Sequence, residues 1–333
     1  MRSGGGQTVF VETAARLHFG VLDLRGTLGR WFGGIGAAAP APTLLLSARP
    51  ADALEVEGDD ADRTAGFARR FLQHFRIQGG ARLRLHRALP PHAGLGSGTQ
   101  LALAVGRALA DLYRVEAAPP DLARAMGRAC RSAIGTWTFA DGGLVVEGGR
   151  LADGDECGPL LARHPFPQSW QCVVAVPHAS RGISGAQEAA AFAQLPRPPE
   201  REVERVAHLV LMALLPALVE ADLTTFGAAL GEIQRISGSW FASVQGGTFA
   251  PGPSETLVRL MTEWGISGVG QSSWGPSVYG IVDGAEAGLA LADRVRAAWD
   301  AAHVSGVVYR GPFRAGGARV WRAPEQDAAP TGA

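Results

Sequence analysis

A glycine-rich segment between Pro91 and Gln100 carries the strongest chemical signal in the sequence. Its glycines at 94, 96 and 98 have no side chains, so backbone N–H groups there can approach an anion closely. Apolar residues at helical spacing follow, and the start of a helix adds partial positive charge. We therefore predict a phosphate-binding loop, with a plain strand-to-helix turn as the structural alternative; its residues are Gly94, Leu95, Gly96, Ser97, Gly98 and Thr99.

A second glycine-rich segment, from Gly265 to Gly280, combines glycines with polar side chains and a tryptophan. We predict phosphate contacts from Gln271, Ser272 and Ser273 and a substrate contact from Trp274. A tight turn around a buried tryptophan is the structural alternative. Two such segments in one chain indicate a bipartite site for a phosphorylated ligand, so we expect both segments to face one cleft.

The basic residues restrict the chemistry. The chain contains no lysine, so its 31 basic residues are all arginines. This excludes a Schiff-base lysine, a lysine-anchored pyridoxal phosphate and the lysine of a Walker A motif. The 31 acidic residues bring the formal net charge to zero, so no basic surplus favours nucleic acid, and we expect no nucleic-acid partner.

Cysteine spacing and hydropathy indicate the compartment. The three cysteines, Cys130, Cys157 and Cys172, form no Cys-x-x-Cys pair, which excludes a zinc or redox motif. The N-terminal residues lack the apolar stretch of a signal peptide. The most apolar stretch, 206–219, is too short to cross a bilayer. We expect a cytoplasmic protein with no membrane partner.

Two weaker motifs are set aside. The segment 34–39 matches G-x-G-x-x-A, but Pro40 and Pro42 follow where a dinucleotide-binding helix should run. The acidic segment 59–64 is only weakly similar to the phosphoribosyl-binding motif of ordinary phosphoribosyltransferases, because no buried apolar strand precedes it. We expect it to be a solvated helix start.

The elements that must position these residues come in small groups. A strand is predicted at 81–89 before the phosphate loop and a long helix after it, and a strand or hairpin is expected at 8–24. Helices do not alternate strictly with strands, which favours an α+β fold. The length of 333 residues suggests two domains, which we place at 1–165 and 166–322, followed by a disordered tail at 323–333.

Pro91-x-x-Gly94-Leu95-Gly96-Ser97-Gly98 resembles the phosphate loop of the GHMP kinase superfamily, and Gly268 to Gly280 resembles its C-terminal glycine-rich motif. Three segments, 15–24, 135–149 and 270–276, are similar to the β-ribofuranosylaminobenzene 5′-phosphate synthase family within that superfamily. The resemblance covers most of the chain. It implies a ribosomal-protein-S5-like N-terminal domain and a ferredoxin-like C-terminal domain.

The resemblance also implies a reaction. In this family 5-phosphoribosyl 1-diphosphate condenses with 4-aminobenzoate, or with 4-hydroxybenzoate in some members, and CO2 and diphosphate are released. The product enters methanopterin biosynthesis. Mg2+ is the expected cofactor. The alternatives are an ATP-dependent small-molecule kinase and a non-catalytic phosphometabolite-binding protein. The kinases usually continue Gly-Leu-Gly-Ser with Ser-Ala or a similar pair of small residues, whereas Gly98-Thr99-Gln100 follow here. This difference and the absence of lysine both count against a kinase.

Motif context supplies further candidate residues. The acceptor carboxylate requires an arginine, and the candidates are Arg16, Arg25 and Arg131. His18 would orient a phosphate or relay a proton. Asp141 would stabilise the sugar cation or bind Mg2+ together with Ser97. The structural alternatives are surface arginines, a core histidine and a turn aspartate. A homodimer is also possible.

Overall fold

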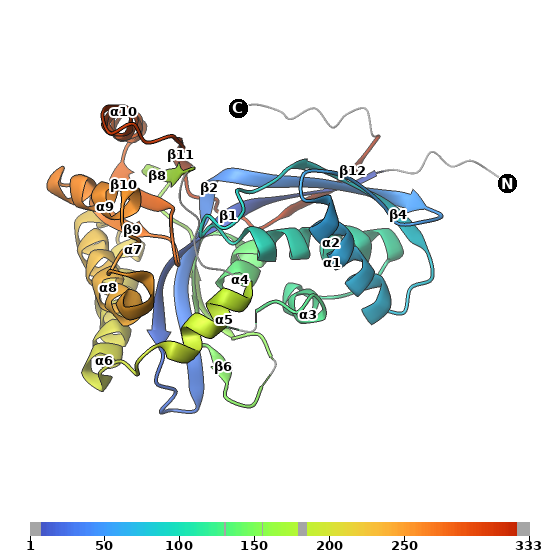
Figure 1. Ribbon diagram of the computed structural model, residues 1–333, viewed down its shortest axis with the longest axis horizontal. Helices are drawn as coiled ribbons and strands as arrows, with labels where there is room; N and C mark the ends of the chain where they lie inside the picture. Colours follow the sequence, from blue (N-terminus) through green and yellow to red (C-terminus); the bar gives the residue numbers. More distant parts are fainter. Residues whose placement is uncertain (1–7, 130, 155, 179–184, 325–333) are drawn as a thin grey trace.

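The computed structural model describes residues 8–129, 131–154, 156–178 and 185–324. Cys130 and residues 325–333 of the predicted tail lie outside this part of the chain. The fold is α+β, as predicted, with one eight-stranded and one four-stranded sheet (Figure 1). Within the described residues, no helix has the length and apolar character needed to cross a membrane.

Two long antiparallel strands form the centre of the large sheet. β1 (Thr8–Asp23) and β2 (Arg30–Ala51) pair along most of their length. β2 is one strand of 22 residues, and it contains the segment 34–39 that was set aside as a dinucleotide-binding motif. Pro40 and Pro42 fit within it because they lie between the stretch paired with β5 and the stretch paired with β4, where no partner on that side needs an N–H donor.

The large sheet has the strand order β12-β1-β2-β4-β3, and β5, β6 and β7 extend it beside the first half of β2. Helices α1 to α4 cover one face of this sheet (Figure 1). Its other elements are β3 (Glu55–Gly58), α1 (Ala61–His74), β4 (Gly80–Arg87), α2 (Ser97–Tyr113), α3 (Pro119–Ala125), α4 (Ile134–Asp141), β5 (Leu144–Glu147), β6 (Arg150–Leu151), β7 (Leu160–His164) and β12 (Arg319–Ala323).

The second sheet has the order β11-β8-β10-β9 and is buried on both faces. Alternate residues of β8 show this, because Val173 and Ala175 pack with α9 and α10, while Cys172 and Val174 join the main core. Its elements are β8 (Trp170–Pro177), α5 (Gly185–Gln194), α6 (Glu200–Leu209), the π-helix η1 (Val210–Leu214), α7 (Leu215–Val219), α8 (Leu223–Gln245), α9 (Pro253–Glu263), β9 (Ser267–Gln271), β10 (Val278–Asp283), α10 (Ala285–Ala301) and β11 (Gly306–Pro312).

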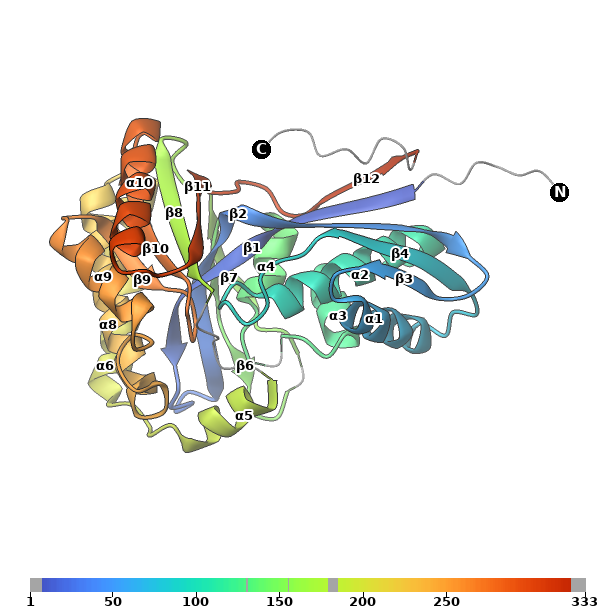
Figure 2. The same ribbon diagram turned by 45° about the horizontal axis from the view of Figure 1, so that its top comes forward.

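Pro216 lies just after the π-helix η1, because a proline has no N–H to complete a regular α-helical turn, and the helices are interrupted at 220–222, before α8. The last strand, β12, returns to pair with β1 in the first sheet (Figure 2). Residues 319–322 therefore pack with the N-terminal half, and Ala323 belongs to a strand rather than to a tail.

Candidate active site

The predicted phosphate loop joins β4 to α2 and has the backbone of an anion site. Gly94 and Gly96 are left-handed, with φ of 74° and 73°, a conformation that other residues disfavour. Within the described residues, the N–H groups of Ser97 and Gly98 have no hydrogen-bond partner. α2 is 17 residues long, so its dipole places partial positive charge at these groups. This geometry suits a phosphate.

The second glycine-rich segment packs directly on the first. Ser272 donates a hydrogen bond to the carbonyl of Gly94 at 2.7 Å, and Ser277 donates to the carbonyl of Ala93 at 2.6 Å. The N–H of His18 donates to the Ser272 hydroxyl at 3.0 Å. A Cβ on Gly94 would lie 2.2 Å from the Ser272 carbonyl oxygen, so this contact requires glycine. The two segments are therefore in direct contact, which the expected shared cleft requires.

A cavity of about 570 Å³, here called the polar cavity, lies against the phosphate loop. Besides residues 92–99 it is lined by four arginines and by parts of two loops. No aspartate or glutamate is among the described residues that line it. The described lining is therefore cationic, although the whole chain is neutral and Asp60 pairs with Arg63 from outside the lining. Its arginines are Arg16, Arg63, Arg128 and Arg131.

Each of three arginines is anchored by a contact within the protein. Arg16 donates from Nη1 to the carbonyl of Gly94 at 2.8 Å. Arg63 is held by Asp60 at 2.8 Å, and Arg128 donates from Nη2 to the Thr99 hydroxyl at 3.2 Å. Sequence reasoning missed Arg63 and Arg128. Arg63 lies in the acidic segment that was correctly set aside as a helix start, and its distance of 34 residues along the chain from Ser97 gave no local signal.

A second cavity, here called the aromatic cavity, adjoins the first and is smaller, about 80 Å³. The rings of Phe192, Phe241 and Trp274 meet edge to face, with centroids 4.8–5.8 Å apart. Phe32 meets Phe192 in the same way at 5.5 Å. The size and the flat apolar walls suit one small planar ring rather than a nucleotide. Of these four aromatic residues, only Trp274 is predicted from the sequence.

The two cavities share a border, so ligands in them would touch. Arg16, Arg131, Ser132, Ser273 and Trp274 line both cavities. The guanidinium of Arg131 lies 5.4 Å from the centre of the Phe192 ring, at the edge of the aromatic cavity. Two arginines at the border can bind a carboxylate between the cavities.

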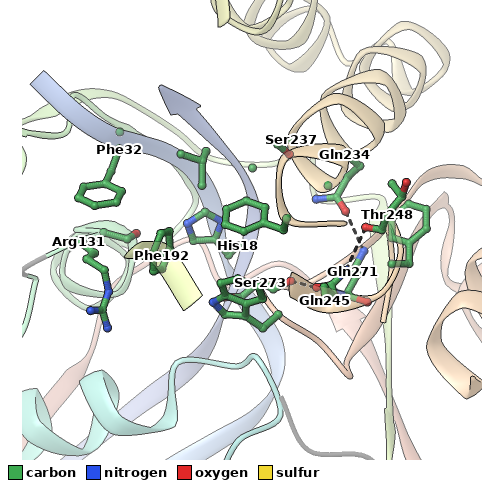
Figure 3. A pocket seen from close by; sticks show the side chains of 18 of the residues that line it. His18, Phe32, Arg131, Phe192, Gln234, Ser237, Gln245, Thr248, Gln271 and Ser273 are labelled. Atoms are coloured by element: carbon green, nitrogen blue, oxygen red, sulfur yellow. Dashed lines mark hydrogen bonds between the residues drawn. The ribbon is translucent and has the colours of Figure 1, made fainter. Parts of the chain in front are cut away.

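His18 lies in the aromatic cavity as a neutral imidazole. It is 7% exposed, and within the described residues no hydrogen bond to its ring is found. Burial, and then the nearby positive charge of Arg16, lower its pKa from 6.5 to about 3. Figure 3 shows Arg131, Phe32 and Phe192 on one side of His18 and the side chains of Gln234, Gln245 and Gln271 on the other. This position suits a neutral orienting group better than a proton relay.

Four of the predicted residues are not placed for the catalytic or ligand-binding roles that the sequence analysis gave them. Asp141 ends α4 and lines neither cavity, because the start of that helix, not its end, faces the loop. Arg25 points away, donating to the Pro198 carbonyl at 2.8 Å. Ser272 is fully buried and already bonded on both sides. Gln271 lines the aromatic cavity, not the polar one, so neither is placed to bind phosphate.

The residues present do not form a magnesium site of their own. Mg2+ in proteins is bound by one or two carboxylates, usually with substrate phosphates. Here the described lining residues of both cavities include no carboxylate, and of the two predicted ligands only Ser97 lies in the polar cavity. No cluster of three or more His, Cys, Asp or Glu side chains suited to a metal is found among the described residues.

The fold and the loop together define the class of protein. A family model described as the GHMP kinases N terminal domain matches residues 63–142. The homoserine kinase of Cytophaga hutchinsonii superimposes with a TM-score of 0.70, at 18% identity over 96% of this chain and 99% of that one. A phosphomevalonate kinase of Streptococcus pneumoniae gives 0.65, at 13% identity over 92% and 99%. These likenesses establish the GHMP kinase fold.

Closer relatives share the sequence as well. The β-ribofuranosylphenol 5′-phosphate synthase of Methanothermobacter thermautotrophicus is 32% identical over 83% of this chain and 89% of its own. The synthase of the same name from Archaeoglobus fulgidus is 33% identical over 84% and 89%. The chain belongs to this synthase family, which confirms the family expected from the motifs.

Proposed function

We propose that this enzyme transfers the 5-phosphoribosyl group of 5-phosphoribosyl 1-diphosphate to a ring carbon of a para-substituted benzoate, with release of CO2 and diphosphate. This is a decarboxylating pentosyltransferase reaction of methanopterin biosynthesis. The observation that carries the proposal is the pair of adjoining cavities, one cationic and one aromatic, whose border contains Arg16 and Arg131.

The polar cavity suits the donor. The loop N–H groups of Ser97 and Gly98 and the guanidinium groups around them are hydrogen-bond donors that face the diphosphate. When the bond between ribose C1 and the diphosphate oxygen breaks, its electron pair stays with the diphosphate, and negative charge grows there. Donors fixed in advance stabilise that charge and so lower the barrier.

The aromatic cavity suits the acceptor. The ring carbon that carries the carboxylate attacks ribose C1, and the para hydroxyl or amino group supplies electron density to it. The bond from that carbon to the carboxylate then breaks and CO2 leaves. The electron pair of the broken bond stays with the ring and restores its aromaticity. The para group therefore activates the ring: the described lining residues include no carboxylate, and the low pKa of the buried His18 makes it a weak base.

The relatives' name favours one acceptor. A ribofuranosylphenol carries a hydroxyl group on the ring, so 4-hydroxybenzoate is the proposed acceptor, with 4-aminobenzoate as the alternative. Mg2+ stays a prediction. Because the described lining of the polar cavity has no carboxylate, we propose that the ion enters with the donor's phosphates. A cytoplasmic location, a homodimer and the lack of a nucleic-acid partner also stay predictions.

Diphosphate release tests the proposal against a kinase. We expect the protein with Mg2+ to release diphosphate only when phosphoribosyl diphosphate and 4-hydroxybenzoate or 4-aminobenzoate are both present. ATP should not replace the donor, because both cavities lack a described carboxylate and the chain lacks lysine. Transfer of phosphate from ATP to a small alcohol would overturn the synthase proposal.

A further inference from the structure

The far side of the aromatic cavity is a network of glutamine side chains with fixed orientations. Gln271 accepts the N–H of Ala250 at 2.6 Å, so its amide oxygen must point there. Its amide nitrogen donates to the side-chain oxygen of Gln245 at 3.1 Å and to the carbonyl of Ser273 at 3.0 Å. The nitrogen of Gln245 donates to two backbone carbonyls, those of Gly247 at 3.1 Å and Thr248 at 3.2 Å.

This network determines what the wall offers a ligand. A primary amide nitrogen has two N–H bonds, and Gln245 and Gln271 each use both within the protein. Among the described residues, each of these two amide oxygens accepts one hydrogen bond, and a carbonyl oxygen can accept a second. Gln245 and Gln271 therefore present oxygen atoms, which attract a hydrogen-bond donor and repel a carboxylate.

Ser237 on α8 has the same character, and Figure 3 shows it on the opposite side of His18 from Arg131. Arg16, His18 and Gly20 of β1 all line the aromatic cavity, and a β-bulge lies between His18 and Gly20. Arg16 contacts the phosphate loop, whereas a Cβ at Gly20 would lie 3.2 Å from the Ser237 hydroxyl oxygen. Ser237 donates its own hydrogen to the carbonyl of Ile233 at 2.8 Å, so its oxygen is left to accept.

The two ends of the aromatic cavity thus have opposite requirements. The guanidinium groups of Arg16 and Arg131 at the border can bind a carboxylate. At the opposite end Ser237, Gln245 and Gln271 offer acceptor oxygens, which favour a donor. A benzoate with a donor at the para position satisfies both ends in one orientation only, and that orientation directs the carboxylate-bearing carbon to the polar cavity.

We propose that Ser237 is a specificity-determining residue whose hydroxyl oxygen accepts a hydrogen bond from the para hydroxyl or amino group of the acceptor. The inference rests on the proposed function, since it assumes a benzoate in the aromatic cavity. It adds that the cavity selects for a para donor and rejects an ether or a bare ring at that position.

Binding of three benzoates to the full-length protein tests this selection. The dissociation constants of 4-hydroxybenzoate, 4-methoxybenzoate and benzoate are measured by calorimetry with saturating inorganic diphosphate. We expect 4-hydroxybenzoate to bind about 3- to 10-fold more tightly than the other two, as one neutral hydrogen bond allows. Ser237→Ala should abolish that preference and leave benzoate affinity within twofold of the original.

A matched control lies on the same helix. Ser239 also donates to a helix carbonyl, that of Ile236 at 2.7 Å, but it is exposed and lines neither cavity. Ser239→Ala should keep the full preference. If the alanine variant misfolds, Ser237→Cys replaces it in the test. Cysteine keeps the size of the side chain but accepts hydrogen bonds poorly, so this variant should also lose the preference for 4-hydroxybenzoate.

The outcomes separate the two claims. A preference that survives Ser237→Ala and Ser237→Cys would overturn the role of Ser237 while leaving the benzoate site intact. Equal binding of 4-hydroxybenzoate and 4-methoxybenzoate by the unaltered protein would also overturn it. If none of the three benzoates binds, the proposed function itself fails, and the role of Ser237 fails with it.

Discussion

Gly98 shows how one missing side chain serves the polar cavity. Its backbone is an ordinary helical one, so glycine is not required there by conformation. A Cβ at Gly98 would instead lie 3.2 Å from the Nη2 atom of Arg63 and 3.3 Å from that of Arg128. The glycine leaves room for both guanidinium groups beside the start of α2, where the donor's diphosphate is proposed to bind.

Gly98→Ala should therefore stabilise the protein and weaken donor binding. Alanine favours a helix by up to about 1 kcal/mol over glycine. The added methyl group must displace both arginines, and we expect the KM for phosphoribosyl diphosphate to rise about 3- to 10-fold. Gly66→Ala on α1, where a Cβ would meet nothing within 4 Å, should bring the stability gain alone. An unchanged donor KM in Gly98→Ala would argue against this placement of the diphosphate.

The border arginines can be separated by steady-state kinetics. Arg16 lines both cavities, whereas Arg128 lines only the polar one. Arg16→Lys should raise the KM of both substrates, because one ammonium group cannot reproduce a planar guanidinium. Arg128→Lys should raise only the donor KM. Loss of one charged hydrogen bond costs about 1.5–3 kcal/mol, or about ten- to a hundredfold. An acceptor KM unaffected by Arg16→Lys would assign the carboxylate to Arg131 alone.

At the scale of elements, a buried carboxylate holds the loop that leads into α4. Glu147 at the end of β5 accepts the N–H of Ala133 at 3.2 Å and the N–H of Gly149 at 2.7 Å. Ala133 follows directly after Arg131 and Ser132, which line both cavities. Burial outweighs these two hydrogen bonds and raises the pKa of Glu147 from 4.5 to about 7.

This raised pKa predicts how stability depends on pH. Between pH 4.5 and 7 the folded protein keeps a proton on Glu147 that the unfolded chain has lost. The free energy of unfolding should therefore decrease as the pH rises through this window, by roughly 3 kcal/mol at most from this group. Urea unfolding at pH 5 and pH 8 measures the change. Glu147→Gln should remove this part of the pH dependence, and the exposed Glu57→Gln should keep it. Equal slopes in all three proteins would contradict the assignment.

The sequence predicts elements well where the signal is local. The phosphate loop, β4 and α2 follow from glycine spacing and hydrophobic periodicity within about 30 residues. The aromatic cavity has no such signal, because Phe32, Phe192 and Phe241 come from β2, α5 and α8 and meet only through the tertiary fold. Asp141 was misplaced for a related reason. Sequence put it near the motif, but α4 carries it to the end away from the loop.

At the scale of the whole molecule, positive and negative side chains balance, but arginines gather at the polar cavity. Equal numbers of acidic and basic residues leave no net charge, yet the described lining of the polar cavity contains arginines and no carboxylate. The cavities lie where the long strand β1, the helices of the large sheet and the loop before β10 meet, so both halves of the chain contribute. The sequence indicated this bipartite site through its two glycine-rich segments, and the division into a donor and an acceptor cavity required the fold.

The fate of the acceptor carboxylate tests the central claim most directly. With 4-hydroxybenzoate labelled in its carboxyl carbon, phosphoribosyl diphosphate and Mg2+, the label should leave as CO2, one molecule for each diphosphate released. The product should be a ribosyl phenol phosphate that carries no label. Attack through the para oxygen would instead leave the carboxylate and all of the label in the product. Diphosphate release with the label retained would contradict the account of a carbon–carbon bond formed at the border of the two cavities.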